Sequence, residues 1–442
     1  MTLPAWLVAN HVALFVVGVI ALGLSRSVLQ QRRPAATSFA WILLLVFVPY
    51  LGIPRYRALG GRKISSRARG KRGLRDESDL QRVHHASKLE WLDDGVVAYQ
   101  AFLRGIEEAH TSIRIVTFVL GDDDAGRSLL AAMTRRAKEG LEVRLLLDDF
   151  LRLRAPRGLL AELVLAGGRV ERFMPLLHVP FRARTNLRNH RKIAVFDGTR
   201  AIVGGMNLAE EYLGPTPNPD RWRDLSLWLE GDAARALDAI VRADWQYACN
   251  EELHPVPHPL GPGEDAIPLK VVPSGPDAVT DPIYEALLTA IYRADRSVWL
   301  STPYFVPDAA LLQAVSAALR RGVEVQIFVP RNSNHALADR VAWPSLRELE
   351  AAGAKIWCYP HMLHAKAVCV DGTWGVVGSA NFDMRSLFLD YEIVLFFERA
   401  AEVTRLAQWF DATRALSELG MAPATFWQKR TEGFAWLLSP LL

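Results

Sequence analysis

One short pattern occurs twice in the chain, and its two copies begin 174 residues apart. The first copy runs from Asn189 to Asn207 and the second from Leu363 to Asn381. Counted from each histidine, Lys stands at +2, Asp at +7, Gly at +14 and Asn at +17 in both copies. The matching residues are His190, Lys192, Asp197, Gly204 and Asn207, and His364, Lys366, Asp371, Gly378 and Asn381. Such a register indicates an internal duplication.

The segments around the two motifs share one order of expected helices and strands. A helix over residues 95–109 leads to the strand S-I-R-I-V-T-F-V, and a helix over residues 286–294 leads to S-V-W-L-S-T-P-Y-F. Alternation of helices with Val/Ile-rich strands predicts α/β layers. We therefore expect two α/β repeats, at residues 85–254 and 269–442, joined by a Pro-rich linker at 255–268.

Two uncharged stretches open the chain, at residues 6–24 and 35–54. Each is long enough to cross a bilayer core, so we expect a two-helix transmembrane hairpin over residues 1–55. A cleaved signal peptide would need basic residues before the first stretch, and none is found there. A pair of buried core helices would leave the Arg-rich flanks unexplained.

The charge of the chain is divided unevenly between its N-terminal segment and the remainder. Residues 1–75 hold 12 Lys/Arg and no Asp/Glu, which leaves 40 Lys/Arg and 48 Asp/Glu for the other residues. Three Arg lie between the two apolar stretches, whereas nine Lys/Arg lie at residues 55–75. This excess predicts a cell-membrane protein whose repeats lie on the cytoplasmic side, with a basic linker at 56–84 that suits an anionic leaflet.

The residue types of the motif indicate a phosphate site. On a strand, residues i and i+2 share a face, so each His is expected beside its Lys. A Lys ammonium repels a metal cation and attracts a phosphate, which argues against a metal site. Gly204 and Gly378 permit a close backbone approach, and Asn207 and Asn381 can donate side-chain N–H groups to phosphoryl oxygens. The three Cys lack metal-site spacing and predict free thiols in a reducing compartment.

These motifs resemble the hallmark of the phospholipase D superfamily, H-x-K-x4-D followed by G-[GS]-x-N, present here twice. Within that superfamily the chain is similar to the bacterial cardiolipin synthases over nearly its whole length. The similarity includes N-L-R-N-H-R-K-I, W-R-D at Trp222–Asp224, T-P-Y-F-V-P-D at Thr302–Asp308 and G-S-A-N-F-D-M-R-S-L. The resemblance implies that the two repeats form one pseudo-symmetric catalytic unit that needs no metal or other cofactor.

The resemblance further implies a two-step displacement at phosphorus through a phosphohistidine. By this analogy a neutral His190 attacks, and a protonated His364 serves as acid and then as base. An orienting carboxylate is expected for each imidazole, Glu392 in the second half and Asp224 in the first. The implied catalytic residues are His190, Lys192, Asp197, His364, Lys366 and Asp371, supported by Asn207, Ser379, Asn381, Asp224 and Glu392. Asp197 and Asp371 stand at strand-to-turn junctions, so an Asx-turn role is an equal alternative.

Three functions are compatible with this reading of the sequence. The first is phosphatidyl transfer that makes cardiolipin from two phosphatidylglycerol molecules and releases glycerol, or another phosphatidyl transfer in which a different lipid headgroup alcohol is the acceptor. The second is hydrolysis by the same site, as a phospholipase or a nuclease; the acidic balance of residues 76–442 disfavours nucleic acid as a partner. The third is a non-catalytic membrane scaffold, which two intact motifs disfavour. The expected partners are therefore phosphatidylglycerol, other anionic phospholipids and the membrane.

Overall fold

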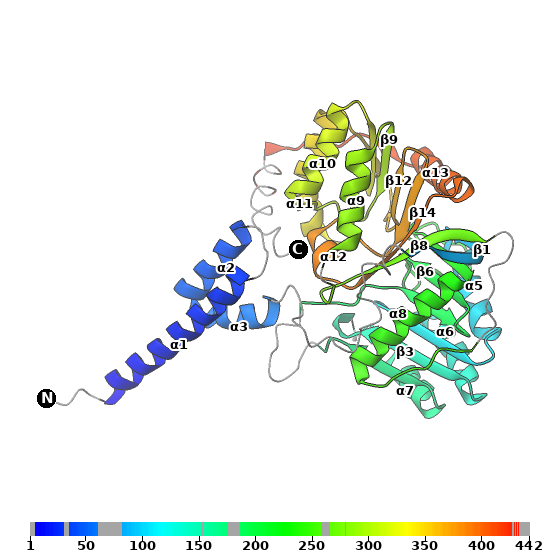
Figure 1. Cartoon of the computed structure of the whole chain (residues 1–442), viewed down its shortest axis with the longest axis horizontal. Helices are drawn as coiled ribbons and strands as arrows, with labels where there is room; N and C mark the ends of the chain where they lie inside the picture. Colours follow the sequence, from blue (N-terminus) through cyan, green and yellow to red (C-terminus); the bar gives the residue numbers. More distant parts are fainter. Residues whose placement is uncertain are drawn as a thin grey trace.

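A computed structural model describes most of the chain (Figure 1). The described residues are 5–30, 35–60, 82–151, 154–175, 186–257, 266–278 and 280–426, with Gln428, Arg430 and Glu432. Most of the expected basic linker, at residues 61–81, and most of the expected Pro-rich linker, at residues 258–265, lie outside this description.

Three helices form an N-terminal hairpin that projects from the rest of the molecule: α1 (Ala5–Gln30), α2 (Ala35–Phe47) and α3 (Pro49–Leu59) (Figure 1). The second expected span is interrupted at Val48, because Pro49 lacks an N–H group and fits the first turn of a new helix. Trp41 and Tyr56 pack edge to face at 5.2 Å inside the hairpin. Among the helical residues described, no helix is both long enough and apolar enough to cross a bilayer.

The first α/β repeat begins at β1, which starts at His84. Its strands are β1 (His84–Leu92), β2 (Ser112–Thr117), β3 (Glu142–Asp148), β4 (Arg169–Phe173), β5 (Ile193–Phe196), β6 (Arg200–Gly204) and β7 (Ser226–Gly231). Its helices are α5 (Gly95–Glu107), α6 (Asp124–Lys138), the short η2 (Asp149–Leu151), α7 (Arg157–Leu165) and α8 (Asp232–Cys249).

The second repeat follows the same order and starts at Ile267, so the last two residues of the expected linker belong to the sheet. Its strands are β8 (Ile267–Ser274), β9 (Ser297–Ser301), β10 (Glu324–Pro330), β11 (Lys355–Tyr359), β12 (Lys366–Val370), β13 (Trp374–Gly378), β14 (Glu392–Phe397) and β15 (Glu418–Leu419). Its helices are α9 (Pro282–Arg293), α10 (Ala309–Arg320), α11 (Ala336–Ala351), α12 (Met384–Phe388) and α13 (Ala400–Ala415).

In the described part of the chain, 15 strands form one mixed sheet in the order β15-β11-β10-β9-β12-β13-β14-β8-β1-β7-β6-β5-β2-β3-β4. Apart from the edge strand β15, this order is symmetric about the β8–β1 pair. β1 and β8 run antiparallel, with His84 opposite Leu269 and Ala86 opposite Ile267. The expected duplicated α/β fold is therefore confirmed, and the two repeats meet across this strand pair.

The hydrophobic core also joins the two repeats. One cluster of buried side chains contains Leu237 and Trp245 from α8 together with Val403 and Trp409 from α13. Two further clusters lie within single repeats, one with α5 and α6 and the other with α9 and α10. Burial of the two Trp side chains at the shared cluster stabilises the contact between repeats through apolar area removed from water.

The motif aspartates Asp197 and Asp371 lie in the turns that follow β5 and β12. Both adopt positive φ angles, +53° and +54°, as the expected D-G turns require. The Asp197 carboxylate accepts hydrogen bonds from the backbone N–H groups of His110, Thr111 and Ser112, at 2.7–3.1 Å. Asp371 accepts the equivalent bonds from residues 295–297. Each carboxylate thus binds its turn to the start of the neighbouring antiparallel strand, β2 for Asp197 and β9 for Asp371.

Replacing Asp197 should therefore destabilise the fold. Burial alone would raise the pKa of this carboxyl, but the backbone donors lower it to about 2, so its stabilisation is lost as the pH falls towards that value. We expect Asp197→Ala to lower the free energy of unfolding by about 2 kcal/mol, measured by urea denaturation at neutral pH. Asp220→Ala, whose side chain is 85% exposed, is the control and should change little. Equal midpoints for both variants would contradict the structural role.

Candidate active site

The two motif histidines stand immediately before β5 and β12, where the backbones of the two repeats touch. The N–H of His190 donates to the carbonyl of Tyr391 at 2.9 Å, and the N–H of His364 donates to the carbonyl of Arg223 at 2.8 Å. Short parallel bridges link Asn189 to Tyr391 and Arg223 to Leu363 beside these bonds. Each histidine is thus positioned by the backbone of the other repeat.

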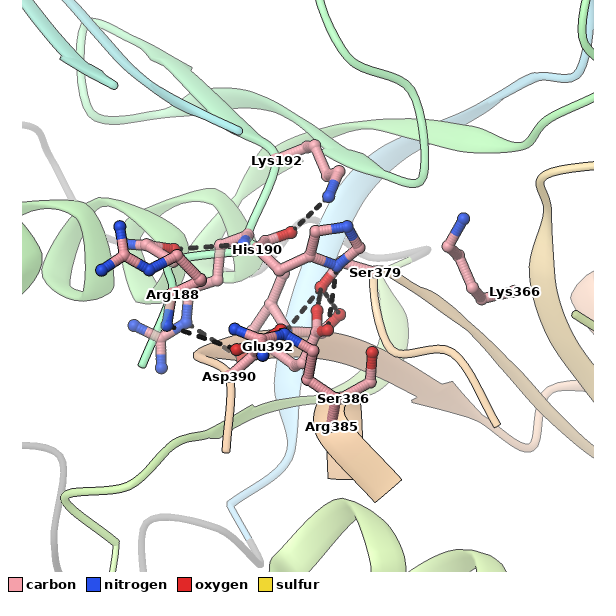
Figure 2. Close-up of polar contacts among 12 residues, drawn as sticks. Arg188, His190, Lys192, Lys366, Ser379, Arg385, Ser386, Asp390 and Glu392 are labelled. Carbon is pink, nitrogen blue, oxygen red and sulfur yellow. Dashed lines mark hydrogen bonds and ion pairs between the residues drawn. The ribbon is translucent and has the colours of Figure 1, made fainter. Parts of the chain in front are cut away.

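The imidazole of His190 is held by Glu392, the first residue of β14 (Figure 2). Its Nδ1 lies 2.9 Å from Glu392 Oε1, and the Glu392 side chain is fully buried. The hydroxyl of Ser379 donates to the other carboxylate oxygen of Glu392. A proton on Nδ1 that is donated to Glu392 leaves Nε2 with the lone pair.

The imidazole of His364 is held in the same way by Asp224. Its Nδ1 lies 2.6 Å from Asp224 Oδ2, and that carboxylate is also fully buried. Gly205 lies beside Asp224, where a Cβ atom would come within 2.1 Å of Asp224 Oδ1. The rings of Tyr212 and Trp222 pack on the imidazole at 5.0 and 5.4 Å.

The carboxylate partners are therefore exchanged between the repeats, which corrects the expected pairing. The sequence placed Glu392 with the second motif and Asp224 with the first, yet each binds the histidine of the other half. The reason is the strand order. β7 and β14 lie next to the central pair β1 and β8, so the residues at their starts reach across to the opposite repeat.

The two motif lysines line the same space as the histidines. Lys192 donates to the carbonyl of His190 at 2.6 Å and lies 5.4 Å from the ring of Phe118. Lys366 lies 3.0 Å from His364 Nε2. In Figure 2 it stands apart from the residues that cluster around His190. Two ammonium groups beside two imidazoles suit the oxygens of a phosphodiester.

The electrostatics of the site keep both imidazoles neutral before substrate binds. Burial, reinforced by Lys192 and Lys366, lowers the pKa of His190 well below its ordinary value. Burial and Lys366 lower the pKa of His364 to about 3, although Asp224 opposes them. The expected division into one neutral and one protonated histidine stays a prediction for the complex with a phosphodiester. A bound phosphodiester would favour imidazolium, since an adjacent negative charge raises a histidine pKa.

The pKa values of the carboxylates and lysines differ between the His190–Glu392 pair and the His364–Asp224 pair. Burial raises the pKa of Glu392 to about 7. Burial would also raise the pKa of Asp224, but His364 and Lys366 outweigh it and lower that pKa. Burial lowers the pKa of Lys192 to about 7 and that of Lys366 to about 8. Asp224 is therefore the more fully ionised of the two carboxylates at neutral pH.

The two motif asparagines are arranged differently, although both are buried. Asn207 Oδ1 accepts the backbone N–H of Val119 at 3.2 Å, and the Asn207 side chain also hydrogen-bonds to Tyr212. Asn381 hydrogen-bonds to the carboxylate of Asp383 through its side chain. Both side chains thus have a partner within the protein, and donation by both asparagines to a phosphate stays a prediction.

Not every expected residue is brought to the histidines. Asp197 and Asp371 are bound to backbone N–H groups at the opposite ends of β5 and β12, so their positions do not support a catalytic role. Phe118, whose ring packs edge-on at 5.1 Å from His190, was missed, because an aromatic residue at the end of a buried strand gives no separate signal. Arg385 was also missed; it lies beside Asp390 and Glu392 in Figure 2.

Comparison with known proteins agrees with this geometry. The family model described as "Cardiolipin synthase, PLD-like domain" matches residues 102–243 and 287–414. The chain is 31% identical to the major cardiolipin synthase of Bacillus subtilis, over 94% of this chain and 95% of that protein. It is 30% identical to the cardiolipin synthase of Listeria welshimeri, over 94% of this chain and 96% of that protein.

A solved structure shares the fold at lower identity. The phosphatidylserine synthase of Haemophilus influenzae superposes with a TM-score of 0.65 at 17% identity, covering 85% of this chain and all of that one. A structural similarity at this sequence identity shows the fold alone, whereas the sequence matches show the family. With both motifs intact and facing one site, the chain belongs to the cardiolipin synthase family of phospholipase D-like proteins.

Proposed function

We propose that this chain is a phosphatidyltransferase that makes cardiolipin from two molecules of phosphatidylglycerol and releases glycerol. The observation that carries the proposal is the pair of His–Lys dyads in one site, each histidine bound to a buried carboxylate. The named activity of the relatives, which match over nearly the whole chain, supports the same reaction.

In the first step, His190 Nε2 attacks the phosphorus of phosphatidylglycerol. The new N–P bond forms as the P–O bond to the glycerol headgroup breaks, and His364 gives its proton to the departing glycerol oxygen. Asp224 supports this assignment, because its ionised carboxylate stabilises a His364 imidazolium once the phosphodiester has raised that pKa. Glu392, with its higher pKa, leaves His190 closer to the neutral form that a nucleophile needs.

In the second step, the headgroup hydroxyl of another phosphatidylglycerol gives its proton to His364. The resulting oxygen attacks phosphorus, the N–P bond breaks and cardiolipin is released. Lys192, Lys366 and the amide of Asn207 stabilise the phosphoryl oxygens in both transition states, and the positions of the two lysines beside the histidines support this role. Hydrolysis would use the same groups, with water in place of the lipid alcohol.

We also propose that the α1–α3 hairpin embeds in the cell membrane and holds the repeats at its cytoplasmic face. Large apolar side chains on these helices are exposed, among them Phe15, Leu22, Phe39 and Phe47. Exposure of such apolar side chains to water is unfavourable, and contact with lipid removes this exposure. The excess of Lys/Arg at residues 55–75 supports the cytoplasmic orientation.

The membrane proposal is tested by extraction. The full chain should stay with the membrane pellet in alkaline carbonate and enter the supernatant only with detergent. In spheroplasts, protease added from outside should leave the repeats intact. Release by carbonate, or digestion of the repeats by external protease, would contradict the proposed anchoring.

The reaction is tested with purified protein in phosphatidylglycerol vesicles. We expect cardiolipin and glycerol in equal amounts, with activity retained in the presence of a chelator, because each histidine lies beside a lysine rather than among metal ligands. Phosphatidic acid as the sole lipid product would show that the site is a hydrolase. The control is His110→Ala, a histidine outside the site, which should keep wild-type turnover.

The role of each histidine is tested with phosphatidyl-p-nitrophenol, a donor whose leaving group departs without an acid. His364→Ala should release one stoichiometric burst of nitrophenolate and then stop, because the phosphohistidine forms but lacks the base for its resolution. His190→Ala should release none, since the nucleophile is missing. A burst from His190→Ala and none from His364→Ala would reverse the assignment.

A further inference from the structure

The two repeats present different side chains at equivalent places around the site. The hydroxyl of Thr117 donates to the carbonyl of Val119, and the hydroxyl of Thr302 donates to the carbonyl of Tyr304, both at 3.0 Å. These matched bonds make Val119 and Tyr304 structural counterparts. An apolar residue in the first repeat is thus replaced by a phenol in the second.

The flank on the side of the first repeat is apolar. Phe118 packs on the imidazole of His190, and Phe150 stacks on Phe118 at 6.3 Å. Phe150 is 56% exposed, so these two rings extend from the catalytic histidine to the surface. This flank suits the acylated glycerol of a phospholipid rather than its headgroup.

The flank on the side of the second repeat is polar. The hydroxyl of Tyr304 donates to Asn334 Oδ1 at 2.5 Å, and the ring of His335 packs edge-on against Tyr304 at 5.4 Å. The loop is held by Ser333, whose N–H donates to Asp339 and whose hydroxyl accepts the N–H of His335, both at 3.0 Å. The phenol oxygen keeps its lone pairs for a further donor, and the Asn334 amide has N–H groups to donate.

A second observation at this flank points to a ligand. Asn381 is 6% exposed, and in the described part of the chain its Oδ1 has no hydrogen-bond partner. The contact with Asp383 fixes the orientation of the amide, because a carboxylate accepts from the amide nitrogen. A buried acceptor without a donor is unfavourable unless a ligand supplies one.

The polar flank lies beside the histidine assigned to the leaving group. Tyr212 packs on His364, and the pKa of Tyr212 is raised by burial, by Asp224 and also by Tyr304. The pKa of Tyr304 is likewise raised by burial and by the charge of Asp383, the partner of Asn381. The Ser301 hydroxyl donates to the carbonyl of Ala365, next to His364, at 3.2 Å, and the N–H of Val306 donates to the carbonyl of Phe382, next to Asn381, at 2.9 Å. The loop that carries Tyr304 therefore lies beside both motif residues.

We propose that Tyr304, Asn334 and Asn381 form a polyol subsite that binds the glycerol headgroup of phosphatidylglycerol. One headgroup hydroxyl donates to Asn381 Oδ1 and another to the Tyr304 oxygen, while the Asn334 amide donates to a headgroup oxygen. The proposal rests on the proposed function. Because the departing glycerol and the attacking headgroup occupy the same side of phosphorus in the two steps, one subsite serves both.

The test measures acceptor choice with two alcohols that share a carbon skeleton. Wild-type protein in phosphatidylglycerol micelles receives equal concentrations of radiolabelled glycerol and 1-propanol, and the two phosphatidyl alcohols are counted. Wild type should favour glycerol. Tyr304→Phe and Asn334→Ala should each lower the glycerol-to-propanol ratio about fivefold, as expected for the loss of one hydrogen bond. Tyr99→Phe, which removes the hydroxyl bonded to Ser128 far from the loop, is the matched control with an unchanged ratio.

The ratio is measured within one reaction, so partial unfolding of a variant lowers both products together and leaves the ratio unaffected. Variants that lose total activity but keep the wild-type ratio would overturn the subsite while leaving the proposed function intact. A wild-type protein without preference for glycerol would overturn it as well. Phosphatidic acid alone from wild type, with neither phosphatidyl alcohol, would instead refute the proposed transfer reaction and the subsite with it.

Discussion

The structure depends on the exchange of carboxylates between the two repeats. His190 binds Glu392 and His364 binds Asp224, so neither repeat alone holds a histidine with its charged partner. A buried carboxylate without its histidine would lose a hydrogen-bond donor, which is unfavourable for a polar group shielded from water. The pairing of β1 with β8 and the shared core of α8 and α13 therefore do more than join two units, because they keep both dyads complete.

The same burial sets the resting state of the site. Four basic side chains lie close together, and water is largely excluded from them. Burial disfavours their charged forms, so the pKa values of both imidazoles fall and those of Lys192 and Lys366 fall to about 7 and 8. A phosphodiester supplies the missing negative charge. A bound phosphodiester would thus favour the protonated forms of the groups that act on it.

Much of this arrangement could be predicted from the sequence. The repeated spacing of His190 and His364 identified the duplication, the phosphate chemistry and the D-G turns. The spacing could not reveal which carboxylate binds which histidine, because this depends on the order of strands in the sheet. It also could not predict that Asn207 and Asn381 have different hydrogen-bond partners. The two motifs have the same residue at this place, but different loops pack on each. The interruption at Val48 follows from Pro49, which lacks the N–H group that a continuous helix needs.

Gly205 and Ser379 occupy equivalent places, each with its backbone N–H bonded to the next strand. Gly205 leaves room for the short Asp224, whereas the Ser379 hydroxyl binds the longer Glu392. A side chain at position 205 would collide with Asp224, so neither of these two residues can change freely while the other stays. The two repeats therefore hold their carboxylates in two different ways, one with a glycine beside Asp224 and one with a serine bound to Glu392. Further divergence of either dyad would have to proceed through paired substitutions, which makes the asymmetry of the two histidines difficult to reverse.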